Sequence, residues 1–150
     1  MIESKEFLKI VKEAGKWKHD INYKLKPLLY EVTNDLGGMY VCEPYKTDLL
    51  QVWKFKDAQT SKSSASKIKD MFFDYIKKKD FVGADLAKKY LKAGSEKKVI
   101  EENCQFYFNE AYEEIKSSKD YEDLKQEFLL KQKEQKIKRE KNERRRFSNF

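Results

Sequence analysis

The sequence lacks the features that define several classes of protein. No run approaches the ~20 apolar residues that a membrane-spanning helix requires, which excludes an integral membrane protein. The first residues are charged and have no long apolar core, so we expect no secretory signal. Cys42 and Cys104 are the two cysteines and His19 is the single histidine, a set without zinc-ligand spacing. We interpret the cysteines as buried free thiols of a cytoplasmic protein, with one disulfide bridge as the alternative.

Signatures of catalysis and of cofactor binding are also missing. The two glycines at residues 37–38 are not followed by the Gly-Lys-Ser/Thr sequence of a phosphate-binding loop. His19 stands beside Asp20, but adjacent side chains rarely face each other and no nucleophile accompanies them. We therefore predict that the protein is not an enzyme and has no cofactor and no metal site.

Two aspartates in the middle of the chain have simpler roles than catalysis. Asp80 precedes an apolar-periodic segment and is placed to cap a helix. Asp85 lies three and four residues before Lys88 and Lys89, the spacing of ion pairs on a helix surface. We favour these structural roles over a catalytic carboxylate pair.

Charge and aromatic rings are abundant. Charged residues make up 39% of the chain, but 14% aromatic residues argue against simple disorder. A length of 150 residues suffices for one domain with a modest core. We predict a compact domain over residues 1–130 and a basic C-terminal extension over residues 131–150.

The excess positive charge is concentrated in that extension. The chain has a net charge of +7, and residues 131–146 carry nine basic and three acidic side chains, which leaves +1 for the rest. All four arginines lie there, and guanidinium groups pair with phosphate oxygens through two hydrogen bonds. A solvated tail is the alternative to a nucleic-acid-binding extension. The predicted RNA-binding residues are Lys131, Lys133, Lys136, Lys138, Arg139, Lys141, Arg144, Arg145 and Arg146.

Apolar spacing predicts a mainly α (α+β) fold, a small helical domain with a short two-stranded β element. We expect helices over residues 2–14, from residue 60 onward with caps among 61–66, over 80–94 with Gly94 as the stop, from about 97 to 115, and from 121 onward. Turns are expected at Pro27 and at residues 34–38, and strands at 39–42 and 49–55. The last helix loses its apolar stripe after residue 130, so we expect it to project from the domain, frayed when free and ordered when bound.

Aromatic residues at helical spacing are predicted core residues. This prediction covers Phe72, Phe73, Tyr107 and Phe108, and we interpret Cys104 on the same apolar face as a core thiol. The role of a second group, around residues 45–54, is less clear because basic and aromatic side chains alternate there. Core packing is favoured, but a base-stacking or rRNA-facing role stays open for Lys46, Trp53 and Lys54.

Five stretches between residues 21 and 94 match a known pattern. The most specific are Glu-Pro-Tyr-Lys at 43–46 and Asp-Phe-Val-Gly-Ala-Asp at 80–85. On these residues the chain resembles the family named domain of unknown function 4385, over about half its length. Members of that family continue with an arginine-rich stretch and an Asn-His pair, whereas this chain has Ser95–Ile100, so no RNA contact is carried over to that segment.

A lysine-rich chain of this size with that domain is also similar to the ribosome dormancy factors of microsporidia. The resemblance implies a monomeric, ribosome-associated protein, away from membranes, that binds rRNA and ribosomal proteins near the small-subunit exit site. It would inhibit translation by occupying the place of tRNA or mRNA on idle ribosomes. The alternatives are a general RNA- or tRNA-binding accessory protein and a module that binds an acidic protein partner. A coiled coil is disfavoured, because the extension lacks sustained apolar positions.

Overall fold

The computed structural model describes residues 17–18, 20–96 and 102–148. The predicted first helix over 2–14 and the candidate His19 lie outside these residues. The described elements are helical, which confirms the mainly α class. They are the 3-10 turn η1 (Pro27–Leu29) and the helices α2 (Tyr45–Val52), α3 (Ala58–Lys77), α4 (Phe81–Glu96), α5 (Glu102–Ile115) and α6 (Lys119–Ser148).

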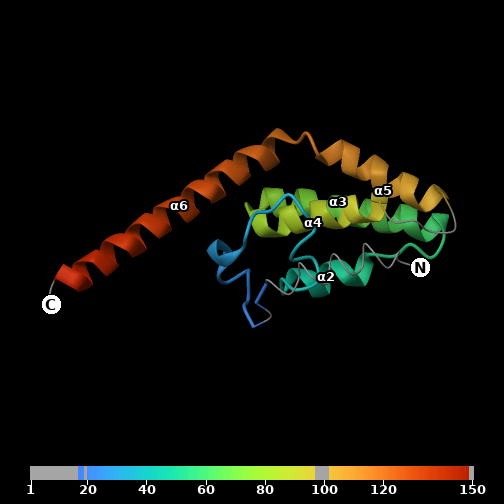
Figure 1. Ribbon diagram of the computed structural model, residues 1–150. Helices are drawn as coiled ribbons and strands as arrows, with labels where there is room; N and C mark the ends of the chain where they lie inside the picture. Colours follow the sequence, from blue (N-terminus) through green and yellow to red (C-terminus); the bar gives the residue numbers. More distant parts are fainter. Residues whose placement is uncertain (1–16, 19, 97–101, 149–150) are drawn as a thin grey trace.

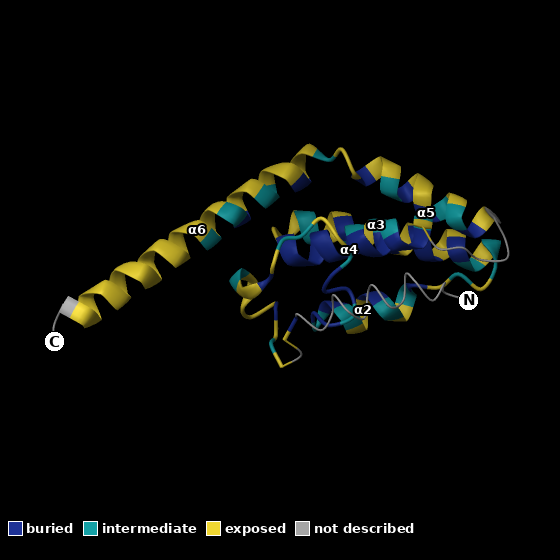
Figure 2. Ribbon diagram, in the orientation of Figure 1, coloured by how far each residue is buried: buried dark blue, intermediate teal, exposed yellow. Residues whose placement is uncertain are grey.

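Helix α4 is the centre of the body. It packs against both α3 and α5, which also pack on each other. Figure 1 shows α2 beneath this group, and α6 crossing its upper side before leading away from it. Almost every residue of α4 up to Gly94 is buried, and Figure 2 shows the buried positions concentrated along this helix. Helix α4 is buried over most of its surface because α2, α3, α5 and α6 all contact it, and Lys88 and Lys92 lie on its partly buried side.

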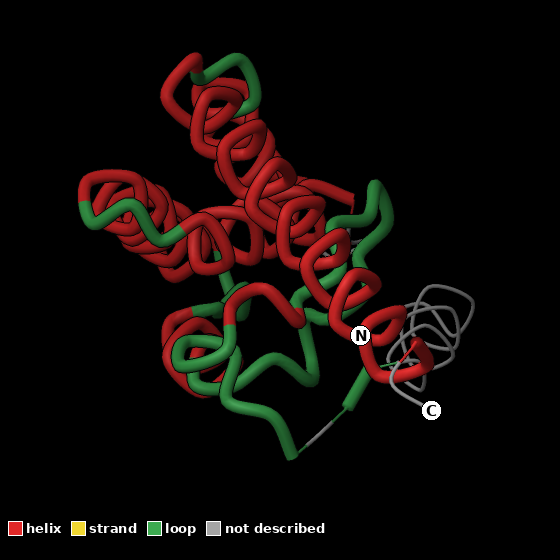
Figure 3. The backbone as a smooth tube through the Cα atoms, turned by 90° about the vertical axis from the view of Figure 1, so that its left-hand side faces the viewer, coloured by secondary structure: helices red, strands yellow, loops and turns green. Residues whose placement is uncertain are grey.

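The two predicted strands are wrong. Residues 39–41 form turns, and residues 45–52 form helix α2. Figure 3 shows no strand in the described ranges, and the parallel bridge between Asn22 and Glu43 is isolated. Tyr45, Leu49 and Trp53 are buried at a spacing of four, which is the period of a helix. Periodicity alone does not separate a short apolar helix from a strand, and the prediction failed for that reason.

Side-chain caps fix where three of the helices begin. Asp57 accepts a hydrogen bond from the Thr60 amide at 2.7 Å, so α3 starts before the predicted caps at 61–66. Asp80 accepts from the Gly83 amide at 3.0 Å, which confirms its predicted role. Ser118 accepts from the Tyr121 amide at 3.2 Å at the start of α6, close to the predicted restart.

Gly94 does not end its helix as predicted. Helix α4 continues to Glu96, and Gly94 lies where α4 and α5 approach each other closely. A Cβ atom there would stand 2.4 Å from Cγ of Phe108, which is fully buried. The glycine is therefore required by helix packing and not by a helix stop.

The core confirms most of the predicted interior. Phe72 and Phe108 are fully buried, whereas Phe73 is 47% exposed, which contradicts its assignment to the core. Tyr107 is partly buried against the core. Cys42 and Cys104 are both buried free thiols, as predicted. Burial raises the pKa of the Cys42 thiol to about 12, so it stays protonated and unreactive at neutral pH.

Candidate nucleic-acid interface

Helix α6 consists of two parts with different surroundings. In its first part Tyr121 and Phe128 are buried in the core, and the Phe128 ring centroid lies 4.9 Å from that of Phe81. Among the described contacts of α6 with the body, the last hydrogen bonds come from Gln132, whose amide donates to the carbonyls of Leu28 at 3.0 Å and Tyr30 at 2.7 Å. The predicted boundary at 130/131 thus falls inside one continuous helix, close to its last anchor.

Beyond Gln132 the helix leaves the body. Residues 133–147 are all exposed, and Figure 2 shows this stretch exposed along its length. We call residues 133–148 the distal half of α6. At about 1.5 Å per residue it is about 23 Å long. Because it has no buried face, its helical form is not stabilised by the core.

The structure places all nine predicted cationic residues of the extension on α6. Lys131 forms an exposed ion pair with Glu127 at 3.4 Å, and the other eight lie in the distal half. At 3.6 residues per turn, positions five residues apart point about 140° from each other. Lys131, Lys136 and Lys141 therefore point in three directions that together cover the circumference. The positive charge surrounds the helix and does not form a one-sided stripe.

The other predicted RNA-binding residues, Lys46, Trp53 and Lys54, do not lie beside the cationic surface of α6. Lys46 is partly buried on α2, and Lys54 is exposed directly after it. Figure 1 shows α2 beneath α3 and α4, while the distal half of α6 leads away from them. The two groups therefore form separate surfaces.

Trp53 is a core residue in this structure. It is 6% exposed, and its ring lies edge-on to Tyr90 and to Phe55, with centroid distances of 5.1 and 5.3 Å. Stacking on a nucleobase requires an open ring face. The burial of Trp53 therefore corrects its candidate rRNA-facing role and agrees with the core packing that was favoured for it.

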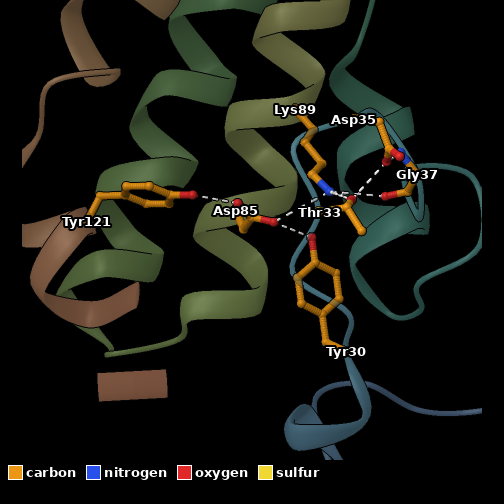
Figure 4. Close-up of polar contacts among 7 residues, drawn as sticks. All are labelled: Tyr30, Thr33, Asp35, Gly37, Asp85, Lys89 and Tyr121. Carbon is orange, nitrogen blue, oxygen red and sulfur yellow. Dashed lines mark hydrogen bonds and ion pairs between the residues drawn. The ribbon is translucent and has the colours of Figure 1, made fainter. Parts of the chain in front are cut away.

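A buried polar network holds the first part of α6 against α4. Asp85 is 3% exposed and accepts hydrogen bonds from the hydroxyls of Tyr30 and Tyr121, the latter at 2.6 Å (Figure 4). Burial and the nearby Asp85 carboxylate raise the pKa of both tyrosines far above the usual value, so their hydroxyls remain donors.

Lys89 completes this network. Its ammonium lies 3.7 Å from Asp85 and donates to the Thr33 hydroxyl at 3.0 Å and the Gly37 carbonyl at 3.2 Å. The predicted Asp85–Lys89 pair is therefore present. Sequence reasoning missed the two tyrosines, because Tyr30 is 55 positions away from Asp85 in the chain.

Sequence reasoning also missed a cleft beside this network. Lys88, Lys92 and Lys125 line it, and they come from α4 and α6. No local pattern joins residues that lie more than thirty positions apart in the chain. The spacing of four between Lys88 and Lys92 was visible, but it is also typical of a solvated helix face.

Other classes of site have little support in the described ranges. They contain no group of three or more histidine, cysteine, aspartate or glutamate residues that could hold a metal ion. None of the helices described combines the length and the hydropathy that a bilayer crossing requires.

Comparisons with known proteins give one match. A search of curated proteins found no match, and a search of solved structures found none either. The family model described as "Domain of unknown function (DUF4385)" matches residues 15–143, which extends well beyond the 21–94 stretch of the resemblance. The matched region includes η1 and helices α2 to α5 and ends within the distal half of α6. With most of its length matched, the chain belongs to the DUF4385 family.

Proposed function

We propose that the protein is a cytoplasmic ribosome dormancy factor that binds rRNA through the distal half of α6. The observation that carries the proposal is a projecting helix with exposed cations on all its sides. A helix that lies on a flat polyanion uses one face only. Cations around the whole circumference suit a helix that enters between RNA strands, where phosphates surround it.

In this proposal the body has a different task. Residues 1–130 carry 24 basic and 23 acidic side chains by subtraction of the extension, so the body has little general attraction to RNA. Because its core is packed with aromatic side chains, we expect the body to keep its shape and to block a site sterically. We infer that the distal half supplies affinity, while the body occupies the place of tRNA or mRNA near the exit site of the small subunit. Inhibition would then be steric and need no turnover.

The test is co-sedimentation with purified ribosomes. In one variant Arg144, Arg145 and Arg146 are replaced by glutamine, which removes three charges and keeps a helix-forming residue. In the matched control the exposed body residues Lys56, Lys67 and Lys77 are replaced by glutamine. We expect the arginine variant to bind at least tenfold more weakly at physiological salt, and the control to bind nearly as wild type. Equal losses in the two variants would reject the role of the distal half.

Two further arms separate the alternatives. If the protein is a general RNA-binding protein, free tRNA in molar excess will displace it from small subunits as readily as unlabelled subunits do. If it binds an acidic protein, nuclease digestion of the ribosomes will leave binding unchanged. A dormancy factor should instead be displaced by unlabelled subunits much more readily than by free tRNA, and it should lose binding after nuclease digestion.

A further inference from the structure

The cleft beside the Asp85 network has the composition of an anion site. It has a volume of about 180 Å³ and lies between α4, the first part of α6 and residues 32–35. Four lysines and two aspartates line it, a net charge of +2. Asn34 and Tyr112 add neutral side chains with hydrogen-bonding capacity.

Three of these lysines line the cleft outside the Asp85–Lys89 pair. Lys88, Lys92 and Lys125 are each partly buried, and none forms an ion pair with a carboxylate of the described residues. Burial lowers the pKa of the Lys88 ammonium; the Asp85 and Glu122 carboxylates raise it, and the charges of Lys125 and Lys92 lower it by smaller amounts. A bound anion would neutralise positive charge that lies partly buried in one cleft.

The aspartate at the base of the cleft does not occupy these lysines. Both oxygens of Asp85 accept a tyrosine hydroxyl, and Lys89 stands beside it. Asp85 and Lys89 therefore neutralise each other, and Figure 4 shows Lys89 turned toward the loop that carries Thr33 and Gly37. The ammonium of Lys88 lies 4.2 Å from the centroid of the Tyr121 ring, a cation–π contact that holds this side chain against α6.

A neighbouring cleft shows what a charge-compensated counterpart looks like. It lies between η1, the α3–α4 turn and α6, and four lysines line it as well. There Lys78 pairs with Asp74 at 2.8 Å and Lys131 with Glu127 at 3.4 Å. Two of its four lysines therefore have carboxylate partners, and the paired Lys78 provides the control for the test.

We propose that the cleft lined by Lys88, Lys92 and Lys125 binds a phosphate monoester. Such a group carries up to two negative charges and three terminal oxygens, which match a net charge of +2 and the three lysines that line the cleft outside the Asp85–Lys89 pair. An internal phosphodiester has one charge and two covalent neighbours, and it suits a small cleft less well. The monoester belongs either to a free nucleotide or to the 5′ end of an RNA. This inference goes beyond the proposed function and does not depend on the distal half of α6.

The test is calorimetric titration of the full chain with adenosine 5′-monophosphate at constant ionic strength. Adenosine, which lacks the phosphate, is the ligand control. We expect saturable binding of the monophosphate only, weakened about tenfold by each of K88Q, K92Q and K125Q, because each removes one charge-assisted contact. The control variant K78Q should bind as wild type. A tetranucleotide with and without a 5′-phosphate separates the two sources. If the phosphorylated tetranucleotide binds, the ligand is an RNA 5′ end. If adenosine 5′-monophosphate binds and the phosphorylated tetranucleotide does not, the ligand is a free nucleotide.

Three results would overturn the proposal. They are the absence of saturable binding of the monophosphate, equal binding of adenosine, and an equal loss in K78Q and K92Q. Because K88Q also alters a contact with Tyr121, the conclusion requires K92Q and K125Q to agree. The variant with Arg144–Arg146 replaced by glutamine should retain this binding, so failure of the ribosome proposal and failure of this one are distinguishable.

Discussion

At the scale of single residues, the structure contains hydrogen bonds whose loss should be measurable. Tyr121 donates to the buried Asp85 at 2.6 Å, and this contact connects α6 to α4. We expect Tyr121→Phe to lower the free energy of unfolding by about 1.5–3 kcal/mol, because a buried carboxylate loses a donor. Urea denaturation measures the change. The control is Tyr23→Phe, whose hydroxyl makes only a long bond of 3.4 Å to a carbonyl, and an equal loss there would contradict the argument.

Gly94 offers a test of packing that opposes helix propensity. Alanine is favoured over glycine in helices by about 1 kcal/mol, so on an exposed face the change would stabilise. Here the added Cβ would lie 2.4 Å from the ring of Phe108. We expect Gly94→Ala to destabilise by about 1–3 kcal/mol through overpacking, measured as a lower midpoint of thermal unfolding. The exposed Ser66→Ala on α3 is the control and should change the midpoint little; a stabilising Gly94→Ala would refute the close approach.

At the scale of elements, α6 should behave as two segments. Its first part is fixed by Phe128 and Gln132, whereas residues 133–147 of the distal half are all exposed. Ion pairs four residues apart stabilise an exposed helix by only about 0.3 kcal/mol each. We expect amide hydrogens of residues 121–132 to exchange slowly and those of 134–147 to exchange quickly in the free protein. Binding to ribosomes should protect the second group, and slow exchange in the free protein would contradict the expected fraying.

The elements also show why part of the fold was predictable and part was not. Long segments with a sustained stripe, such as α3 and α5, and the Asp80 cap follow from local patterns. Helix α2 has eight residues, too few for its period to be distinguished from a strand, and its true partners lie on α3 and α4. The charge of the extension was visible in the sequence. The Asp85 network and the lysine cleft were not, because they join residues that only the tertiary fold brings together.

At the scale of the whole molecule, stability and affinity should reside in different parts. Within the described residues, Gln132 makes the last hydrogen bonds of α6 to the body, so a chain that ends there keeps these bonds and the buried residues Tyr121 and Phe128. We expect the chain of residues 1–132 to unfold at nearly the same temperature as the full chain. A fall of several degrees would mean that the distal half contributes to folding.

Ribosome binding, unlike the unfolding temperature, should change strongly when the chain is cut after residue 132. On a single-stranded polyanion the slope of log K against log salt changes by about 0.7 for each phosphate neutralised, so nine cations give at most about −6. The truncated chain retains one of these nine side chains, Lys131, which already pairs with Glu127, so its slope should approach zero. Ribosome binding measured at four or more salt concentrations gives both slopes. If the truncated chain kept the steep slope, the phosphate contacts would have to lie on the body. Because the body is nearly neutral overall, these contacts would then come from a local site such as the lysine cleft.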